Sequence, residues 1–573
     1  MIQEAPARVR FLWAFIRPFR HRLLLALFGL TFVSFASLVA PWLVRIMVNR
    51  FGGQLPTDLP ATSLSLILLG VFGCSAVIGY YQQKEMRILG YRLRNVMRLA
   101  LYDSLLRRAM SFHGRAQVGE LSSRATEDLG NIHIVFSGIL SPIFQNMLFI
   151  VGCIALMASL NWAATLLVLS LVALPVPVLI MLSKRIRRLS SETRSEHAWA
   201  NAFLTESLAA MRDIKAFVRE KLELRRYAGV LRRALAAEAE ISSLNVKADQ
   251  AVYLLFSVTL LGIFYFGTRP TFLGTWGLGD VIAFYFYSYT MTMAVLSVGR
   301  TYFAFQEFSG TLGRIMELLP DHERADPPPF RPYAERVTGK IEFKSVGFAY
   351  DPPRPVLRNV SFTVHPGEWR LITGPSGSGK STIANLLMGF VEPRTGHISV
   401  DDIPLGLWQE GPLRRQIGYV GQDPVLLHGT LRENILFADL QATEEQIQSA
   451  VFNACLEDVI ESLPAHLETL VGERGATLSA GQKARVALAR AILHDPPVLL
   501  LDEANAAFEP ELERRIWRNL ARLRTGKTTI IFSHHVRNIP AMYTALELRD
   551  GILGKQSRQA ASNPPVPETE TQQ

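Results

Sequence analysis

The sequence predicts a multidomain membrane protein. An all-α domain of six transmembrane helices with long cytoplasmic extensions is followed by an α/β domain with a phosphate-binding loop. Of the 573 residues, 49% are hydrophobic, and the long apolar runs lie before about residue 310, whereas the rest has the mixed composition of a soluble domain. That second part contains the glycine-rich segment GPSGSGKS, which is typical of phosphate binding.

Six apolar segments are long enough to cross about 30 Å of hydrocarbon, which takes roughly 20 helical residues. One such segment also fits a buried helix of a soluble protein, but six in succession favour membrane spans. The transmembrane domain is assigned to residues 1–318. We place its helices near residues 23–48, 62–83, 132–158, 163–183, 250–268 and 279–303.

Basic residues set the predicted orientation, because lysine and arginine concentrate in cytoplasmic loops. They are dense before the first span and after the second and fourth, whereas the turns on the other side carry only Arg50, Asp58 and Arg269 as charged residues. The N-terminus and the C-terminal domain are therefore expected in the cytoplasm. These basic residues also account for much of the net charge of +10, since the cytoplasmic leaflet is anionic, and no nucleic-acid partner is expected.

Cys74, Cys153 and Cys455 lie far apart without CxxC spacing, which favours buried thiols over a disulfide framework or a metal site. No small-residue cleavage site follows the first apolar run, so this run is predicted to be an anchor and not a removed signal peptide. We expect a multi-pass protein of the plasma (inner) membrane of a bacterium.

Two cytoplasmic connections are too long to be turns, and their apolar residues keep a helical period. A helix from roughly 62 to 110 would be about 70 Å long at 1.5 Å per residue, which exceeds the thickness of a bilayer. Each projection is interrupted once, at 111–121 and at 206–217. We interpret these interruptions as coupling turns that contact the soluble domain; the alternative is an ordinary helix–helix turn.

The soluble part of the chain begins after a proline-rich, charged linker. Its final segment lacks apolar periodicity, which predicts disorder. The linker is assigned to 319–339, the nucleotide-binding domain to 340–555 and the tail to 556–573.

The strongest motif is G-x-x-x-x-G-K-[ST], placed between a strand-like segment, WRLITG, and a helix-like one, TIANLLMG. Backbone amides of such a loop point at phosphate oxygens, the lysine reaches the β and γ phosphates, and the serine holds Mg²⁺. ATP and Mg²⁺ are therefore the expected ligands. The predicted contacts in this loop are Gly374, Pro375, Ser376, Gly377, Ser378, Gly379, Lys380, Ser381 and Thr382.

The segment PVLLLDE at 497–503 is predicted to supply a second group for the metal. Its apolar residues fit a strand buried on both faces, with Asp502 at the exposed end as a ligand of Mg²⁺. Glu503 follows, placed to polarise a water against the γ phosphate. Acidic residues often end strands for structural reasons, but the accompanying phosphate loop favours the catalytic interpretation.

With a further segment, LSAGQ at 478–482, these motifs resemble an ABC transporter half of the exporter type, in which six membrane helices are fused to one ATP-binding cassette. The resemblance covers about 10 to 550. It implies that the residues of this signature contact the ATP held by the other cassette of a dimer, which explains why one chain carries two anion-binding loops. The signature residues are Ser479, Ala480, Gly481 and Gln482.

The resemblance assigns further residues. Tyr350 would stack on adenine, although an aromatic at a strand edge is the alternative. Gln422 would sense Mg²⁺ and water, His534 would contact the γ phosphate, and Glu473 would meet the cytoplasmic loops. A metal site at His534 and His535 is a weaker alternative. The resemblance thus makes Glu503, His534, Lys380 and Gln422 catalytic, and Ser381, Gln422 and Asp502 the ligands of Mg²⁺.

The sequence departs from the family pattern in two places. Ala480 replaces the second glycine of the signature, and the added methyl group is expected to be tolerated. AAFE at 506–509 stands where SALD is common, so Glu509 adds a methylene and Ala506 removes a hydroxyl. We expect altered communication between the two ATP sites, or a natural partner that is a different chain.

The resemblance implies ATP-driven export of an amphipathic substrate (a lipid, drug or peptide) by a dimer that alternates between inward-facing and outward-facing states. The second half-transporter is either identical or different. Arg45 and Arg300 are candidates for a cavity, since charges in spans rarely face lipid. Two other functions stay open: an importer with the exporter fold, as used for metal-chelate uptake, and an ATP-gated channel or regulator.

Overall fold

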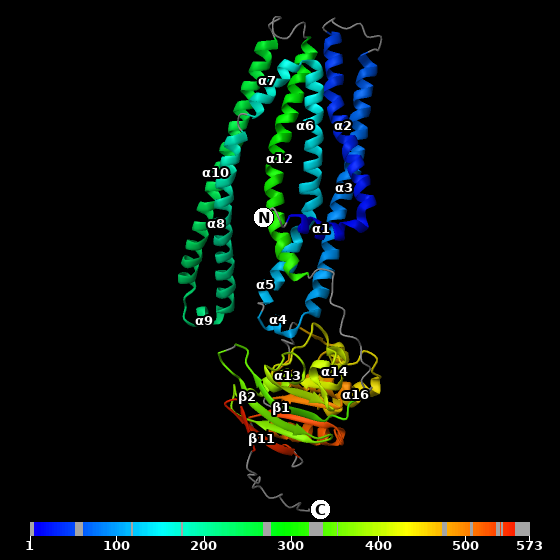
Figure 1. Cartoon of the computed structure of the whole chain (residues 1–573), viewed down its shortest axis with the longest axis vertical. Coiled ribbons are helices and arrows are strands. Elements are labelled where there is room, and N and C mark those ends of the chain that lie inside the picture. The colour runs from blue at the N-terminus through cyan, green and yellow to red at the C-terminus, as the bar shows by residue number, and fades with distance from the viewer. Residues whose placement is uncertain are drawn as a thin grey trace, which may run out of the picture. The chain divides into compact units, whose positions relative to one another are not determined.

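The computed structural model describes residues 5–51, 61–115, 118–173, 176–267, 277–319, 336–351, 353–472, 478–504, 508–534, 539 and 543–555. They fold into two compact units (Figure 1). The first holds the helices from α1 to α12 apart from α4. The second holds α4 together with the strands from β1 to β12 and the helices from α13 to α19.

Long helices dominate the first unit. The helix expected from roughly 62 to 110 is confirmed by α3 (Ala61–Arg107), which packs along α2 (Arg20–Phe51). α8 (Val176–Ala209) and α10 (Glu220–Gly267) pack along each other and form the hairpin closed by α9 in Figure 1. The other elements are α1 (Ala5–Ile16), η1 (Arg17–Phe19), α5 (Val118–Ser123), η2 (Arg124–Asp128), η3 (Asn131–His133), η4 (Val135–Leu140), α6 (Ser141–Leu160), α7 (Trp162–Ala173), α9 (Met211–Ala216) and α12 (Leu278–Leu318).

Among the described residues, four helical stretches are long and apolar enough to cross a membrane. They overlap the first, second, third and sixth expected spans. The fourth expected span falls on α7, a shorter apolar helix, and on the start of α8, and the fifth falls on the C-terminal part of α10. The four stretches are Arg10–Arg50, Thr62–Arg107, Val135–Leu160 and Leu278–Leu318.

The two arginines predicted to face a cavity are each paired with an aspartate. Arg45 of α2 forms an ion pair with Asp280 in the first turn of α12, and the Tyr287 hydroxyl donates to the Leu38 carbonyl at 3.0 Å. Arg300, on α12, lies 2.5 Å from Asp249 on α10. Pairing is the usual way to lower the cost of a charge inside a span, and these contacts connect α12 to α2 and to α10.

Two main sheets form the centre of the second unit. One is four-stranded in the order β2-β1-β4-β5, and the other is six-stranded in the order β12-β11-β3-β10-β9-β6. In the second sheet, β11, β3, β10, β9 and β6 run parallel to one another. The strands are β1 (Ile341–Phe348), β2 (Leu357–Val364), β3 (Trp369–Thr373), β4 (Thr395–Val400), β5 (Ile403–Pro404), β6 (Ile417–Val420), β7 (Gly429–Thr430), β8 (Leu470–Val471), β9 (Val498–Asp502), β10 (Thr528–Ser533), β11 (Tyr543–Arg549) and β12 (Ile552–Lys555).

Both faces of the parallel sheet are covered, which explains the unbroken apolar run of β9. Leu499 and Leu501 pack into the core that includes residues of α18, whereas Val498 and Leu500 pack into the core that includes residues of α13. Successive side chains of a strand point to opposite faces, so all four positions must be apolar. The helices of this unit are α4 (Met110–Arg115), α13 (Lys380–Leu387), η5 (Leu405–Leu407), α14 (Glu410–Gln416), α15 (Leu431–Leu436), α16 (Glu444–Asn453), α17 (Glu457–Ser462), η6 (His466–Glu468), α18 (Ala480–His494) and α19 (Pro510–Leu523).

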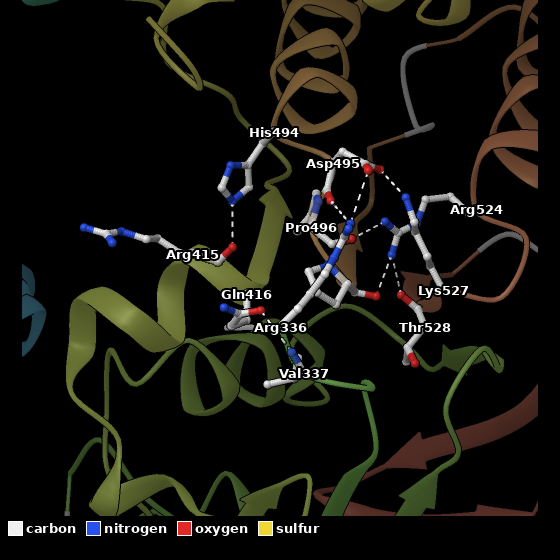
Figure 2. A network of polar contacts seen from close by, with 11 residues as sticks. Arg336, Val337, Arg415, Gln416, His494, Asp495, Pro496, Arg524, Lys527 and Thr528 are labelled. Carbon is white, nitrogen blue, oxygen red and sulfur yellow. Dashed lines mark hydrogen bonds and ion pairs between the residues drawn. The ribbon is translucent and has the colours of Figure 1, made fainter. Parts of the chain in front are cut away.

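A polar network closes the amino end of β9 and β10 (Figure 2). Asp495, the left-handed C-cap of α18, accepts from Lys527 Nζ at 2.5 Å and from Arg336 Nη2 at 3.3 Å. Arg524 is 4% exposed and donates to the carbonyls of Pro496, of Pro497 at 3.0 Å and of Thr528 at 2.7 Å. Burial lowers the pKa of Arg524 to about 10, so the guanidinium stays charged at neutral pH and its bonds are charge-assisted.

Replacing Arg524 by Met is expected to destabilise the second unit by about 3 kcal/mol, because three charge-assisted hydrogen bonds to buried backbone carbonyls are lost. For a unit of this size that loss corresponds to a fall in Tm of roughly 6–12 °C, measured on the purified full-length chain. Arg518, exposed on α19, is the matched control, and Arg518→Met should leave Tm within about 1 °C. Equal Tm values for both variants would contradict the assigned role of Arg524.

Candidate nucleotide-binding site

Four neighbouring parallel strands end at the same edge of the sheet. Thr373, the last residue of β3, is paired with Ser533 of β10. Phe532, one residue earlier on β10, is paired with Asp502 of β9. β6 ends at Val420, which is paired with Leu501 of β9. Residues that follow these strands therefore gather at one place, the usual position of a ligand site in a parallel sheet.

The loop after β3 starts a helix. Gly379 is the N-cap of α13 with φ of +106°, and a Cβ at this position would lie 2.8 Å from Leu357 Cδ2. Gly377 has φ of +79°, with open space around it. The loop therefore presents a helix N-terminus and a backbone conformation that suits glycine, as phosphate binding requires.

Lys380 lies across this loop. Its side chain is buried, and Nζ donates to the carbonyls of Gly374 at 2.9 Å and Pro375 at 3.0 Å. The same ammonium group is 3.4 Å from Glu503 Oε1. The lysine thus lies between the loop and the carboxylate that follows β9.

Glu503 is the meeting point of the residues expected to be catalytic. Gln422 Nε2 donates to Glu503 Oε2 at 3.0 Å, and His534 Nδ1 lies 3.1 Å from Glu503 Oε1. The backbone of Glu503 has φ of +51°, a strained conformation for a residue with a side chain, and its amide donates to the Phe532 carbonyl at 2.9 Å. Three side chains from three different strand ends therefore hold this carboxylate.

Asp502 has the properties of a metal ligand. It is 2% exposed, and burial raises the pKa of its carboxyl group, while hydrogen bonds from Ser381 and Tyr419 act in the opposite direction. Among the described residues, its Oδ1 atom has no hydrogen-bond partner, and neither does the buried hydroxyl of Ser378. Mg²⁺ prefers oxygen ligands. The unpartnered Oδ1 atom of Asp502, together with the Ser381 hydroxyl that bonds to the same carboxyl group, fits this preference. Gln422, the third expected ligand, donates to Glu503 Oε2.

Tyr350 lies beside α13. Its ring is 49% exposed, packs edge-on against Phe348 at 4.8 Å between centroids, and its hydroxyl accepts from Asn385 Nδ2 at 3.3 Å. About half of this residue is therefore accessible, as the predicted stacking on adenine requires.

The signature segment forms the start of α18. Ser479 is the N-cap, its hydroxyl accepts from the Gln482 amide at 3.3 Å, and the Gln482 side chain accepts from the Ser479 amide at 2.8 Å. This capping box was not predicted, although its pattern S-x-x-Q is visible in the sequence. Ala480 is exposed in the first turn, so its methyl group meets no packing conflict within the chain.

Some predicted residues lie outside the described ranges, namely Glu473, Ala506 and His535. Glu509 is described: it is the N-cap of α19, and its side chain makes no cap hydrogen bond. Tyr419, which donates to Asp502 Oδ2 at 3.4 Å, is a contact that sequence reasoning missed. Its place on β6, next to the strand that ends in Asp502, is the signal that could have found it.

Comparison with known proteins supplies the family. Residues 23–295 match the model of the ABC transporter transmembrane region, and residues 357–506 match the model of the ABC transporter. The chain belongs to the ABC transporters. One transmembrane region followed by one cassette in a single chain is the organisation of an exporter-type half-transporter, so both the expected family and the expected fold class are confirmed.

Relatives and a solved structure agree with this assignment. The chain is 27% identical to an ATP-dependent lipid A-core flippase of Chromohalobacter salexigens, over 95% of this chain and 93% of the relative. It is 29% identical to a mitochondrial potassium channel ATP-binding subunit of Rattus norvegicus, over 95% and 78% respectively. The structure of a bacterial Atm1-family ABC exporter with ATP bound shares the fold, with a TM-score of 0.81, 24% identity and 94% of each chain covered.

The cassette implies ATP binding and ATP-hydrolysing transport. The apolar helices indicate a multi-pass membrane protein, and the half-transporter organisation indicates pairing with a second half.

Gly377 and Gly379, two of the positive-φ glycines of the phosphate loop, should respond differently to alanine. Gly379→Ala is expected to weaken ATP binding more than tenfold, because a Cβ would collide with Leu357. Gly377→Ala adds only backbone strain of about 1–2 kcal/mol, since its surroundings are open. ATP dissociation constants of the full-length variants, measured with a fluorescent analogue and competition by ATP, test the order. A weaker affinity in Gly377→Ala than in Gly379→Ala would contradict the loop geometry.

Proposed function

We propose that this chain is one half of an ATP-driven exporter whose Glu503 polarises the attacking water at the γ phosphate. The observation that supports it is the convergence of Lys380, Gln422 and His534 on the Glu503 carboxylate. A carboxylate held from three sides is oriented before the reaction starts, which is what a general base needs.

Each residue of the site has a separate task in this proposal. Lys380 exchanges the carbonyls of Gly374 and Pro375 for phosphate oxygens. Ser381 and Asp502 hold Mg²⁺, which when bound offsets the charge of the phosphates. Gln422 and His534 keep the Glu503 carboxylate directed at the water, and His534 also reaches the γ phosphate.

In this proposal, the other half-transporter supplies the contacts on the second side of each ATP. The exposed N-terminus of α18, with Ser479 as its cap, has the amide groups and the helix dipole that favour an anion. Two cassettes that close on two ATP molecules would separate after hydrolysis, and the helices of the first unit would then alternate between inward-facing and outward-facing states.

We propose an amphipathic substrate, such as a lipid, drug or peptide, and a location in the plasma (inner) membrane of a bacterium with the cassette in the cytoplasm. The similarity to a lipid A-core flippase and the exposed aromatic side chains of α12, among them Phe286, Tyr289 and Phe305, support this class. A gating function is the second candidate, favoured by the similarity to an ATP-binding subunit of a potassium channel.

Glu503→Gln is expected to lower ATP turnover at least about 100-fold while ATP affinity changes by less than about threefold, because the amide keeps the shape but cannot accept a proton. The measurement is phosphate release and ATP binding by the full-length protein in lipid vesicles. Glu511→Gln, at an exposed position of α19, is the control and should keep wild-type turnover. Undiminished turnover in Glu503→Gln would show that another group activates the water.

The same vesicles separate the two candidate functions. Export predicts ATP-dependent accumulation of a fluorescent lipid or dye in vesicles whose cassettes face outward, and no such accumulation in Glu503→Gln. Loss of a preloaded probe from the same vesicles would instead indicate import. An ATP-dependent ion current without net probe movement would favour the gating function.

A further inference from the structure

We propose that Tyr419 is a positioning residue that orients Asp502, so that one of its carboxylate oxygens stays reserved for the metal ion. The inference deepens the proposed function and rests on it, because it concerns the same site. Tyr419 lies on β6, and the register places it opposite Leu500 of β9, two residues before Asp502. Its hydroxyl donates to Asp502 Oδ2 at 3.4 Å.

The two oxygens of Asp502 are not equivalent. Oδ2 accepts the tyrosine hydroxyl, whereas Oδ1 is buried and has no partner among the described residues. A buried carboxylate oxygen without a donor is costly unless a cation or a water satisfies it. The contact on Oδ2 therefore leaves Oδ1 as the oxygen available to Mg²⁺. The carboxyl group of Asp502 also receives a hydrogen bond from Ser381.

Tyr419 is suited to act as a permanent donor. Although 36% of its side chain is exposed, its hydroxyl lies against the buried carboxylate. An ionised carboxylate can only accept hydrogen bonds, so in this contact the phenol hydroxyl is the donor.

Gly421 makes room for this arrangement. A Cβ at position 421 would lie 3.1 Å from both Cε1 and Oη of Tyr419, closer than side chains normally approach. The tyrosine ring thus lies across the backbone immediately before Gln422, which bonds to Glu503 at 3.0 Å. One short segment therefore orients the metal ligand through Tyr419 and the proposed base through Gln422.

The test uses Mn²⁺ as the probe, with its binding to the full-length protein followed by electron paramagnetic resonance in the presence of a non-hydrolysable ATP analogue. Tyr419→Phe should weaken Mn²⁺ binding by ~3- to 10-fold, the range expected for one lost hydrogen bond to a charged group, while affinity for the metal-free nucleotide stays unchanged. Gly421→Ala, which displaces the ring without removing the hydroxyl, should also weaken Mn²⁺ binding. The Mg²⁺ concentration for half-maximal ATPase should rise in the same proportion.

Tyr543→Phe is the matched control, because Tyr543 lies opposite Trp369 at the start of β3, away from the loop, and should bind Mn²⁺ like the wild type. Wild-type Mn²⁺ affinity in both Tyr419→Phe and Gly421→Ala would overturn the inference and leave the proposed function standing. A wild-type protein that binds neither the nucleotide nor Mn²⁺ would overturn both. Thermal unfolding of each variant shows whether its weaker Mn²⁺ binding comes from loss of the fold. If Mn²⁺ binding weakens only in a variant that is unfolded, that variant counts against the inference.

Discussion

The parallel register of β3, β10, β9 and β6 is the constraint on which the site depends. Because these strands are neighbours and end at one edge, the loops that follow them bring Lys380, His534, Glu503 and Gln422 together from positions as much as 154 residues apart in the chain. The buried apolar strands supply the rigidity that the polar residues need. The left-handed backbone of Glu503 is strain that such a framework can support.

The opposite end of the sheet is held by different means. There Arg524 supplies donors to the carbonyls around β9 and β10, and Asp495 joins α18 to Arg336 and Lys527 (Figure 2). α18 begins at Ala480, directly after the signature serine, and ends in this network. The helix proposed to face the partner's nucleotide is thus fixed at its C-terminal end to the strands that carry the proposed catalytic residues. Both helix starts that we propose to bind phosphate, at Lys380 and at Ala480, thereby belong to one framework.

Much of this could be predicted from the sequence because the determining signals are local. The phosphate loop, the doubly buried strand before Asp502 and the long helix α3 are each encoded by a contiguous pattern of glycine spacing or apolar period. The contacts of Tyr419, Arg524 and Arg300 could not be predicted, because they join residues on different elements and depend on the order of the strands or on how the helices pack. Gln422 shows the same limit: the resemblance gave it a role, but only the structure shows that its side-chain amide donates to Glu503 Oε2.

In the proposed dimer, each ATP lies between the phosphate loop of one chain and the signature serine of another. Vanadate trapped with ADP and Mg²⁺ in the assembled full-length protein occupies the γ-phosphate position and, under ultraviolet light, cleaves the backbone beside it. Cleavage is expected both within residues 374–381 and at Ser479. Cleavage confined to the phosphate loop, with Ser479 intact in a fully trapped sample, would contradict it.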